Sequence, residues 1–296
     1  MSKSKNIYLK ENLIKIFLSL STLISVLTTL GIIISLLTES LPFFQEGRFF
    51  ALFKFGTLWD PRSNRYSIWP LFTGTLMIVI FSSLFALPLG LGSAIYLSEY
   101  SNPKLRNILK PILEILAGIP SVVYGFFAFL YITPLLKKFP FWEVDTYNVL
   151  SASFAVGIMI TPLVASISED ALKAVPSSLR EASLALGATK FETVWNVTVP
   201  AAISGIVSSF ILAISRAIGE TMVVSMAAGS KPVLNLNPLG QIQTMTGYMV
   251  SKSFGEVPVG SLEYQTVFVI GLILFLMTLT LNILAKKIIT RFREVY

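Results

Sequence analysis

The sequence predicts an all-α membrane protein with six transmembrane helices. Of its 296 residues, 54% are hydrophobic and 13% are charged, about half the charged share of a soluble domain, which is about 25%. The mean hydropathy is +0.73. Six long stretches are almost free of Asp, Glu, Lys and Arg and lack the alternation of a barrel strand. Helices are therefore the expected way to satisfy their backbone groups in lipid.

The six spans follow from the positions of the charged residues. A bilayer core of about 30 Å needs about 20 apolar residues in a helix, and each stretch is long enough. The predicted spans are residues 16–38, 66–98, 115–136, 146–168, 201–228 and 264–285. The first is longer than the apolar core of a signal peptide and lacks a clear cleavage site, so we expect it to be retained.

The distribution of Lys and Arg predicts the orientation. Of the 23 such residues, fourteen fall on the side of the two termini and eight on the other side, and Arg216 lies inside the fifth span. The cytoplasmic side carries the excess, so both termini are expected in the cytoplasm. The predicted organisation is a cytoplasmic segment (1–15), the first transmembrane helix (16–38), an external loop (39–67), a transmembrane core (68–287) and a cytoplasmic tail (288–296).

The residue types argue against an enzyme. Cys and His are absent, which excludes disulfides, zinc sites built from Cys or His, cysteine nucleophiles and imidazole acid–base catalysis. Neither a nucleophile–base pair nor a Gly-x-x-x-x-Gly-Lys-Ser/Thr loop is present. We therefore expect no catalytic residue, no metal site and no cofactor on this chain, and any ATP must be hydrolysed by another chain.

The connection between the fourth and fifth spans contains a predicted short helix. Pro176 and the serines after it provide a helix start. Residues 179–186 are mostly strong helix formers, and Gly187 is a natural C-terminal stop. The helix is amphipathic, with Leu179, Ala182 and Leu186 on one side. From periodicity alone, it is equally well explained as a connecting helix that packs under its own bundle.

The spacing in this connection resembles the EAA loop of bacterial ABC importer permeases. Glu181-Ala182-Ser183 is followed after three residues by Gly187, and after nine more by Val197-Thr198-Val199-Pro200. The family pattern is Glu-Ala-Ala, Gly and Ile-x-Leu-Pro at the same spacing. The resemblance implies a type I ABC importer permease fold and a coupling loop at about residues 173–200 that contacts a separate ATPase. It assigns that contact to Glu181, Ala182, Ser183, Gly187 and Pro200.

Arg216 and Glu220 are the two charges inside the fifth predicted span. A charge in mid-bilayer costs about 2.5–3.5 kcal/mol on insertion scales, so it normally faces a partner or a water-filled path. Four residues apart on one helix, the two are expected to share a face. One interpretation is an internal ion pair that locks the bundle. The other is a polar pathway, in which the forked guanidinium of Arg216 suits a tetrahedral oxyanion and the carboxylate positions it.

Three further segments resemble phosphate-specific ABC importer permeases, and specifically their PstC-type subunit. They are residues 215–222 around Arg216, residues 116–125 in the third span, and residues 55–61 with 69–75. The resemblance implies that Arg216, Glu220 and Thr221 contribute to a phosphate path. It also implies a heterodimer with a PstA-type permease, a PstB-type ATPase dimer that carries ATP and Mg²⁺, and a PstS-type phosphate-binding protein.

Two other functions remain open at the level of sequence. A secondary transporter or channel working alone would need its own coupling charges or filter, and one Arg–Glu pair is little for that purpose. A permease for sulfate or molybdate would share the EAA loop, but the segment 216–221 favours phosphate.

Overall fold

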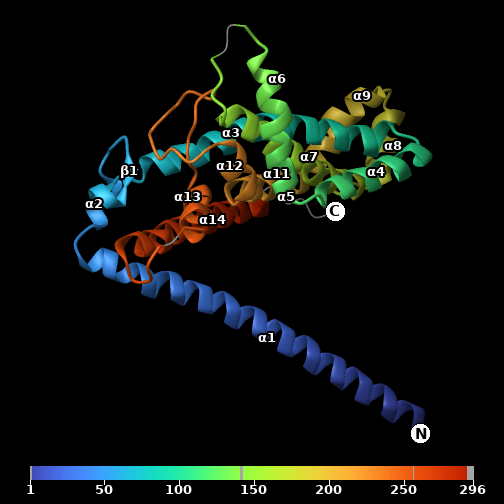
Figure 1. Cartoon of the computed structure of the whole chain (residues 1–296). Coiled ribbons are helices and arrows are strands. Elements are labelled where there is room, and N and C mark those ends of the chain that lie inside the picture. The colour runs from blue at the N-terminus through green and yellow to red at the C-terminus, as the bar shows by residue number, and fades with distance from the viewer. Residues whose placement is uncertain (1, 141–142, 256, 292–296) are drawn as a thin grey trace.

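The computed structural model describes residues 2–140, 143–255 and 257–291, and this part of the chain is almost entirely helical (Figure 1). A two-stranded antiparallel hairpin, β1 (Trp59–Asp60) and β2 (Arg65–Tyr66), is the exception. The helices are α1 (Ser2–Gln45), α2 (Phe49–Phe53), η1 (Pro61–Ser63), α3 (Trp69–Ile95), η2 (Tyr96–Tyr100), α4 (Pro103–Ala117), α5 (Ser121–Phe127), η3 (Ala128–Ile132), α6 (Thr133–Lys137), α7 (Val149–Lys173), α8 (Ser177–Ala185), α9 (Lys190–Thr193), η4 (Val194–Thr198), α10 (Val199–Ala201), α11 (Ile203–Ile218), α12 (Met222–Ala227), α13 (Met245–Ser253) and α14 (Leu262–Arg291).

Four of these helical segments are long and apolar enough to cross a membrane. They are Glu11–Gln45 in α1, Trp69–Tyr100 in α3 and η2, Val149–Lys173 in α7, and Leu262–Thr290 in α14. Two further candidates are bent pairs: Pro103–Ala117 with Ser121–Lys137, bent by 88°, and Lys190–Ala201 with Ile203–Ile218, bent by 70°. The described chain thus has four candidate spans, or up to six if each bent pair counts as one.

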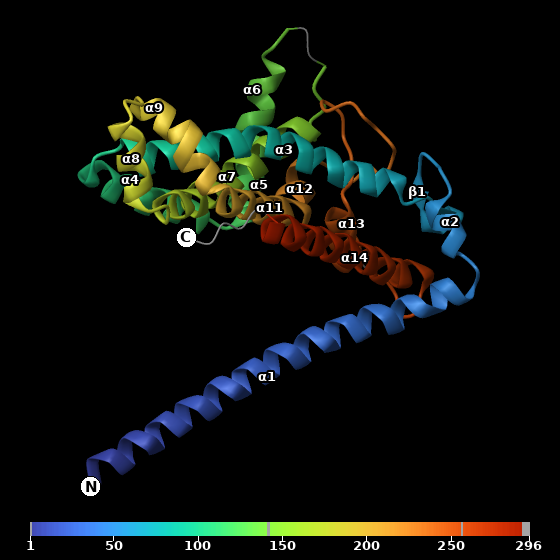
Figure 2. The same cartoon turned by 180° about the vertical axis from the view of Figure 1, so that it is seen from behind.

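The core of the bundle is the contact between α3 and α7, which lie side by side (Figures 1 and 2). Glycine on each helix allows the backbones to approach. A Cβ atom on Gly90 would lie 2.6 Å from the Cβ of Val164, and one on Gly157 would lie 2.9 Å from the ring of Phe85. Small residues at a helix interface are the usual route to tight packing in a membrane, where burial from water does not drive association.

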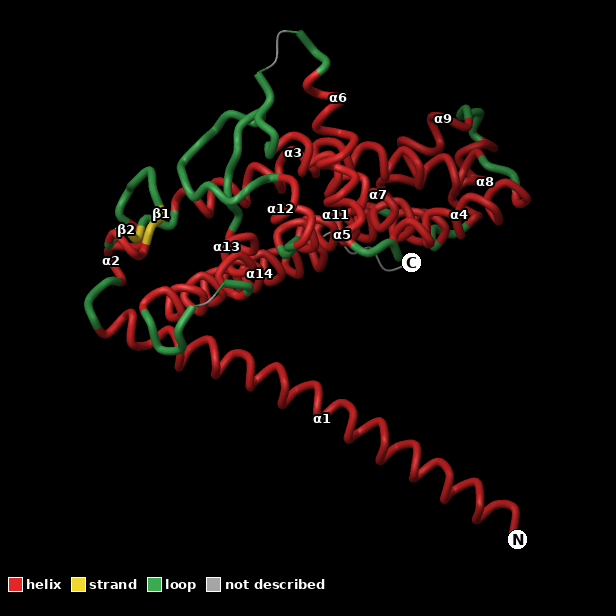
Figure 3. Tube along the Cα trace, in the orientation of Figure 1, coloured by secondary structure: helices red, strands yellow, loops and turns green. Residues whose placement is uncertain are grey.

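The two ends of the bundle differ in structure. At one end, which we call the hairpin end, lie α2, β1 and β2, and the buried Trp59 packs edge-on against Tyr248 of α13. At the other end, the α8 end, lie α4, α8 and α9 (Figures 1 and 2). The long connection between α12 and α13 is irregular (Figure 3), in agreement with its density of Gly and Pro.

Helix α1 stands away from the rest of the molecule (Figure 1). Its contact with α14 lies toward its C-terminal part, where Leu36 approaches Gly271. The helix continues through Glu39 to Gln45, so the predicted external loop, 39–67, begins as helix. The reason is packing, because Phe43 is fully buried against Tyr66 of the hairpin.

Two predicted spans are not continuous helices. The stretch 115–136 is interrupted at residues 118–120, where α4 ends on Gly118 and α5 begins after Pro120. Proline lacks an N–H and disfavours helical backbone in the residue before it, so the helix breaks completely before Pro120. The stretch 201–228 is interrupted at residues 219–221, between α11 and α12. The predicted tail 288–296 begins as helix, because α14 reaches Arg291, and its residues 292–296 lie outside the described part.

Candidate functional site

The break between α11 and α12 is held by Glu220. Its carboxylate is buried, with 8% of the residue exposed, and its Oε1 accepts hydrogen bonds from the backbone N–H groups of Met222 (3.0 Å) and Val223 (3.1 Å). These N–H groups at the start of α12 have no partner within that helix. Thr221 donates its hydroxyl to the carbonyl of Gly219 (3.0 Å), and Thr246 donates to the carbonyl of Glu220 (2.6 Å).

Arg216 is not paired with Glu220. Because α11 ends at Ile218, the expectation that the two residues share one face of a continuous fifth helix is wrong. Arg216 is exposed on the surface of the bundle. Within the described part of the chain, no hydrogen bond or ion pair engages its guanidinium, which lies near Tyr124 of α5. An internal pair that locks the bundle is therefore excluded as the role of Arg216.

The two breaks lie next to each other because α5 packs against α12. The contact passes through Gly125, where a Cβ atom would lie 3.1 Å from the side chain of Met226 and 3.3 Å from the Cα of Val223. Gly125 is thus a close-packing position. Tyr124 closes the first break by donating its hydroxyl to the carbonyl of Leu116 (2.8 Å). Arg216 therefore projects where two interrupted helices meet.

A cavity of about 420 Å³ lies beside the contact between α5 and α12. Its wall combines aromatic rings with small polar groups, from Phe126, Phe129, Tyr147, Ser225, Met226, Gly229, Ser230 and Gln241. The sequence analysis did not single out these residues, because the cavity is formed by segments far apart in the chain. Among the described residues, no group of three or more acidic or His side chains could hold a metal ion.

The predicted short helix of the coupling loop is present as α8 and ends as expected at Gly187. This residue has φ +89°, the left-handed region that favours glycine. The N–H of Gly187 donates to the carbonyl of Leu184 (3.0 Å), and the N–H of Ala188 donates to that of Ser183 (3.3 Å). This is the Schellman pattern of helix termination. The chain then restarts in α9, where Thr189 and Glu192 cap each other's backbone reciprocally.

The five residues assigned to ATPase contact divide into an exposed and a packed group. Glu181, Ala182, Gly187 and Pro200 are exposed, whereas Ser183 is half-buried. The Ser183 hydroxyl hydrogen-bonds that of Thr193 (2.9 Å), which joins α8 to α9. The predicted apolar side of α8 is not a single packed face. Leu179 packs against a buried cluster, but Leu186 is 90% exposed at the helix end, which argues against a helix that merely packs under its own bundle.

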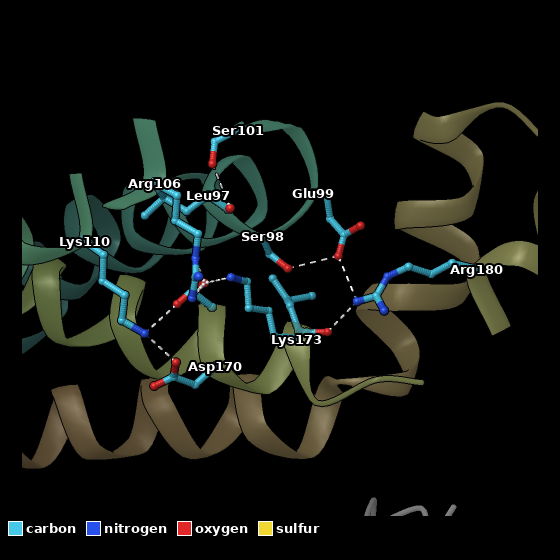
Figure 4. A network of polar contacts seen from close by, with 11 residues as sticks. Leu97, Ser98, Glu99, Ser101, Arg106, Lys110, Asp170, Lys173 and Arg180 are labelled. Carbon is cyan, nitrogen blue, oxygen red and sulfur yellow. Dashed lines mark hydrogen bonds and ion pairs between the residues drawn. The ribbon is translucent and has the colours of Figure 1, made fainter. Parts of the chain in front are cut away.

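A network of charged side chains lies under α8 (Figure 4). The side chain of Glu169 in α7 is 1% exposed. It forms ion pairs with Arg106 (2.8 Å) and Lys110 (2.8 Å) of α4 and with Lys173 (3.1 Å) of its own helix. Arg180 of α8 pairs with Glu99 of η2 (3.0 Å). The sequence analysis missed both pairings. The only available signal was the clustering of charges at the ends of predicted spans.

Comparison with known proteins identifies the class of the chain. Residues 86–294 match the model of the family described as "Binding-protein-dependent transport system inner membrane component". The chain belongs to this family. It is therefore a permease subunit of an ABC transporter in the inner membrane, and it is not an enzyme, because ATP hydrolysis in such transporters lies on separate subunits.

Curated members of this family confirm the resemblance to PstC-type subunits. The "Phosphate transport system permease protein PstC" of Haemophilus influenzae is 30% identical over 302 residues, covering 96% of this chain and 94% of the relative. The "Probable ABC transporter permease protein YqgH" of Bacillus subtilis is 34% identical over 235 residues, covering 79% of this chain and 75% of the relative.

Solved structures of importers in this class show the same fold. The inward-facing MetNI methionine ABC transporter aligns with a TM-score of 0.59 at 20% identity, covering 77% of this chain and 98% of its own. A bacterial alginate ABC importer aligns with a TM-score of 0.58 at 13% identity, covering 82% of this chain and 87% of its own. The chain therefore has the type I ABC importer permease fold that the EAA loop implied.

Proposed function

We propose that this chain is the permease subunit of an ATP-driven importer of inorganic phosphate. The observation that carries this proposal is the guanidinium of Arg216, which is exposed at the meeting point of two helix breaks without a carboxylate partner. The PstC relatives, described as phosphate transport permeases, support the choice of substrate.

A guanidinium on the surface of a membrane helix needs a polar environment. Leaving it in lipid costs about 2.5–3.5 kcal/mol on insertion scales, and no carboxylate of the described chain forms an ion pair with it. We infer that this surface faces a water-filled path between the chain and a second, PstA-type permease. There the guanidinium fork offers parallel N–H donors to a phosphate oxyanion, and Thr221 lines the same path beside the break.

The role proposed for Glu220 is to shape the path rather than to neutralise Arg216. Its carboxylate is used by the N–H groups of Met222 and Val223, which fixes where α12 begins. Arg216 is thereby left free to pair with an incoming anion. Release remains possible because a single guanidinium makes a shallow site for an anion.

We propose that α8 transmits the movement of a separate ATPase to the membrane helices. The exposed Glu181, Ala182, Gly187 and Pro200 contact a PstB-type ATPase dimer, and a PstS-type protein delivers phosphate from the opposite side of the membrane. With each bent pair counted as one crossing, the chain has six spans. We infer that both termini lie in the cytoplasm. This is supported by the N-terminal end of α1 and the C-terminal end of α14, which both point toward the α8 end (Figures 1 and 2).

Replacing Arg216 tests the proposal. In the complete importer, Arg216→Gln is expected to lower phosphate uptake at least about 100-fold, because two charge-assisted hydrogen bonds of about 1.5–3 kcal/mol each are lost. Arg216→Lys keeps the charge but not the fork, and should retain partial uptake. The matched control is Arg62→Gln, which removes an arginine paired with Glu263 at the hairpin end.

Uptake of radiolabelled phosphate is measured in cells that lack other phosphate importers, with the amount of assembled complex checked by co-purification. Competition with excess sulfate and molybdate distinguishes a phosphate permease from one for another oxyanion. Full uptake in the assembled Arg216→Gln variant would remove Arg216 from the path.

A further inference from the structure

Arg180 connects the coupling helix to two other elements through one side chain. It precedes Glu181 in α8, but its guanidinium points back toward the bundle (Figure 4). It donates to the carbonyls of Leu172 (2.7 Å) and Val175 (2.7 Å), at and just beyond the end of α7. It also donates to Oε1 of Glu99 (3.0 Å). Exposed carbonyls at a helix C-terminus favour a cation.

Glu99 extends the contacts of Arg180 to a further helix of the bundle. It lies in η2, the π-helical continuation of α3, and its side chain is only 9% exposed. The hydroxyl of Ser98 donates to the same Oε1 (3.0 Å). If Arg180 served only to cap the end of α7, its hydrogen bonds to the carbonyls of Leu172 and Val175 would be sufficient. The additional carboxylate means that α8 is bound to the ends of both α3 and α7.

A second group of ion pairs, around Glu169, connects the end of α7 to α4. The buried carboxylate of Glu169 joins α7 to Arg106 and Lys110 of α4, and Lys110 also pairs with Asp170 (2.6 Å). Helices α3 and α7 are already packed along their length. The ends of α4 and α7 are therefore held together by ion pairs to the buried carboxylate of Glu169, which solvent screens much less than exposed pairs. The end of α3 joins them through its packing against α7.

The covalent link between α8 and α7 is short. Residues 174–176 join α7 to α8, with Val175 buried among Leu172, Ala202 and Ile206. Leu179 and Ser183 add partial packing. The exposed side of α8 is the part available to another chain. A displacement imposed there acts on the bundle through Arg180 as well as through this link and packing.

We propose that Arg180 and Glu99 are positioning residues for energy coupling, which make the ends of α3 and α7 follow α8. This inference rests on the proposed function, because it needs an ATPase that moves α8. The pair does not touch the transported anion. Its loss should leave ATP hydrolysis and Arg216 intact while weakening the link between hydrolysis and transport.

The test measures ATP hydrolysed per phosphate taken up by the complete importer in proteoliposomes. Arg180→Gln and Glu99→Met are each expected to raise this ratio at least about five-fold, the low end of ordinary coupling between sites. The double variant should be no worse than either single variant, because both act through one contact. The control is again Arg62→Gln, which breaks an Arg–Glu pair at the hairpin end and should leave the ratio unchanged.

Glu99→Met keeps the inference testable if Arg180→Gln fails to assemble, because it leaves both carbonyl contacts of Arg180 in place. An unchanged ratio in the assembled Glu99→Met variant overturns the proposal. If the unmodified importer takes up no phosphate with ATP, the proposed function itself fails, which is a separate outcome.

A second measurement replaces the ion pair by a covalent link. The chain has no cysteine, so a variant with both Glu99→Cys and Arg180→Cys carries two unique thiols that a short bifunctional maleimide can join. Cross-linking should return the ratio of ATP to phosphate toward that of the unmodified importer. A cross-linked importer that stays uncoupled shows that the connection between α8 and η2 does not transmit the movement.

Discussion

At the scale of single residues, Gly187 determines how α8 ends. Its φ of +89° is costly for any residue with a Cβ atom, by roughly 1–2 kcal/mol. No other atom lies within 4 Å of the position that a Cβ would occupy. The cost of a substitution is therefore in the backbone and not in a clash, and it falls on the turn between α8 and α9.

Substitutions at Gly187 should rank by their tolerance of left-handed backbone. Gly187→Asn is expected to keep coupled transport, because Asn adopts this conformation most readily after Gly. Gly187→Ala should weaken coupling, and Gly187→Glu should abolish it by adding a large charged side chain to an exposed partner surface. Phosphate uptake and ATP hydrolysis in the reconstituted importer measure the ranking. Normal ATP-driven transport with Gly187→Glu would count against a coupling role for this turn.

The candidate site was only partly predictable at this scale. The EAA spacing located α8 and its stop at Gly187 because both depend on local sequence. Arg216 was identified because a charge in an apolar stretch is conspicuous. Its separation from Glu220 was not predicted, because the carboxylate finds partners in the backbone N–H groups two and three residues ahead. Arg180 was overlooked because Glu99 lies 81 residues away in the chain.

At the scale of elements, charge-free stretches located the long helices but not the breaks. Predicted spans 66–98, 146–168 and 264–285 correspond to α3, α7 and α14. Hydropathy does not detect the interruptions at residues 118–120 and 219–221, because these short segments contribute little to the mean over a window. Their backbone groups are satisfied by tertiary contacts from Tyr124 and Thr246, which no local pattern reveals.

The contact between α5 and α12 depends on the lack of a side chain at Gly125. A Val at this position would press on the Cα of Val223 and on Met226. Overpacking of this kind typically costs about 1–3 kcal/mol. We expect Gly125→Val to lower the thermal stability of the purified chain and to reduce uptake, because the two breaks that flank Arg216 are displaced.

The matched control is Gly92→Val in α3, where no atom lies within 4 Å of the position that a Cβ would occupy and the residue is exposed. Both variants add the same side chain to a helix, so the difference in melting temperature isolates the packing at Gly125. Equal melting temperatures for the two variants would show that α5 and α12 are free to separate without loss of stability.

At the scale of the whole molecule, the bundle has two chemically different ends. The α8 end carries a concentration of Lys and Arg, including Lys104, Arg106, Lys110, Lys173, Arg180 and Lys190. Several of them are engaged by Glu169, Asp170 and Glu99. The positive-inside rule counts Lys and Arg and not net charge, so these ion pairs do not weaken the expectation that the α8 end is cytoplasmic.

Two single cysteines test this orientation in a chain that has none of its own. Ser63 is exposed in the hairpin region and Asn107 is exposed on α4, so each can carry a thiol accessible to water. A membrane-impermeant maleimide applied to intact cells should label Ser63→Cys fully. It should label Asn107→Cys only after the membrane is permeabilised. The opposite pattern would place α8 outside the cell, where no ATPase could act on it, and would remove the physical basis for ATP-driven import through this chain.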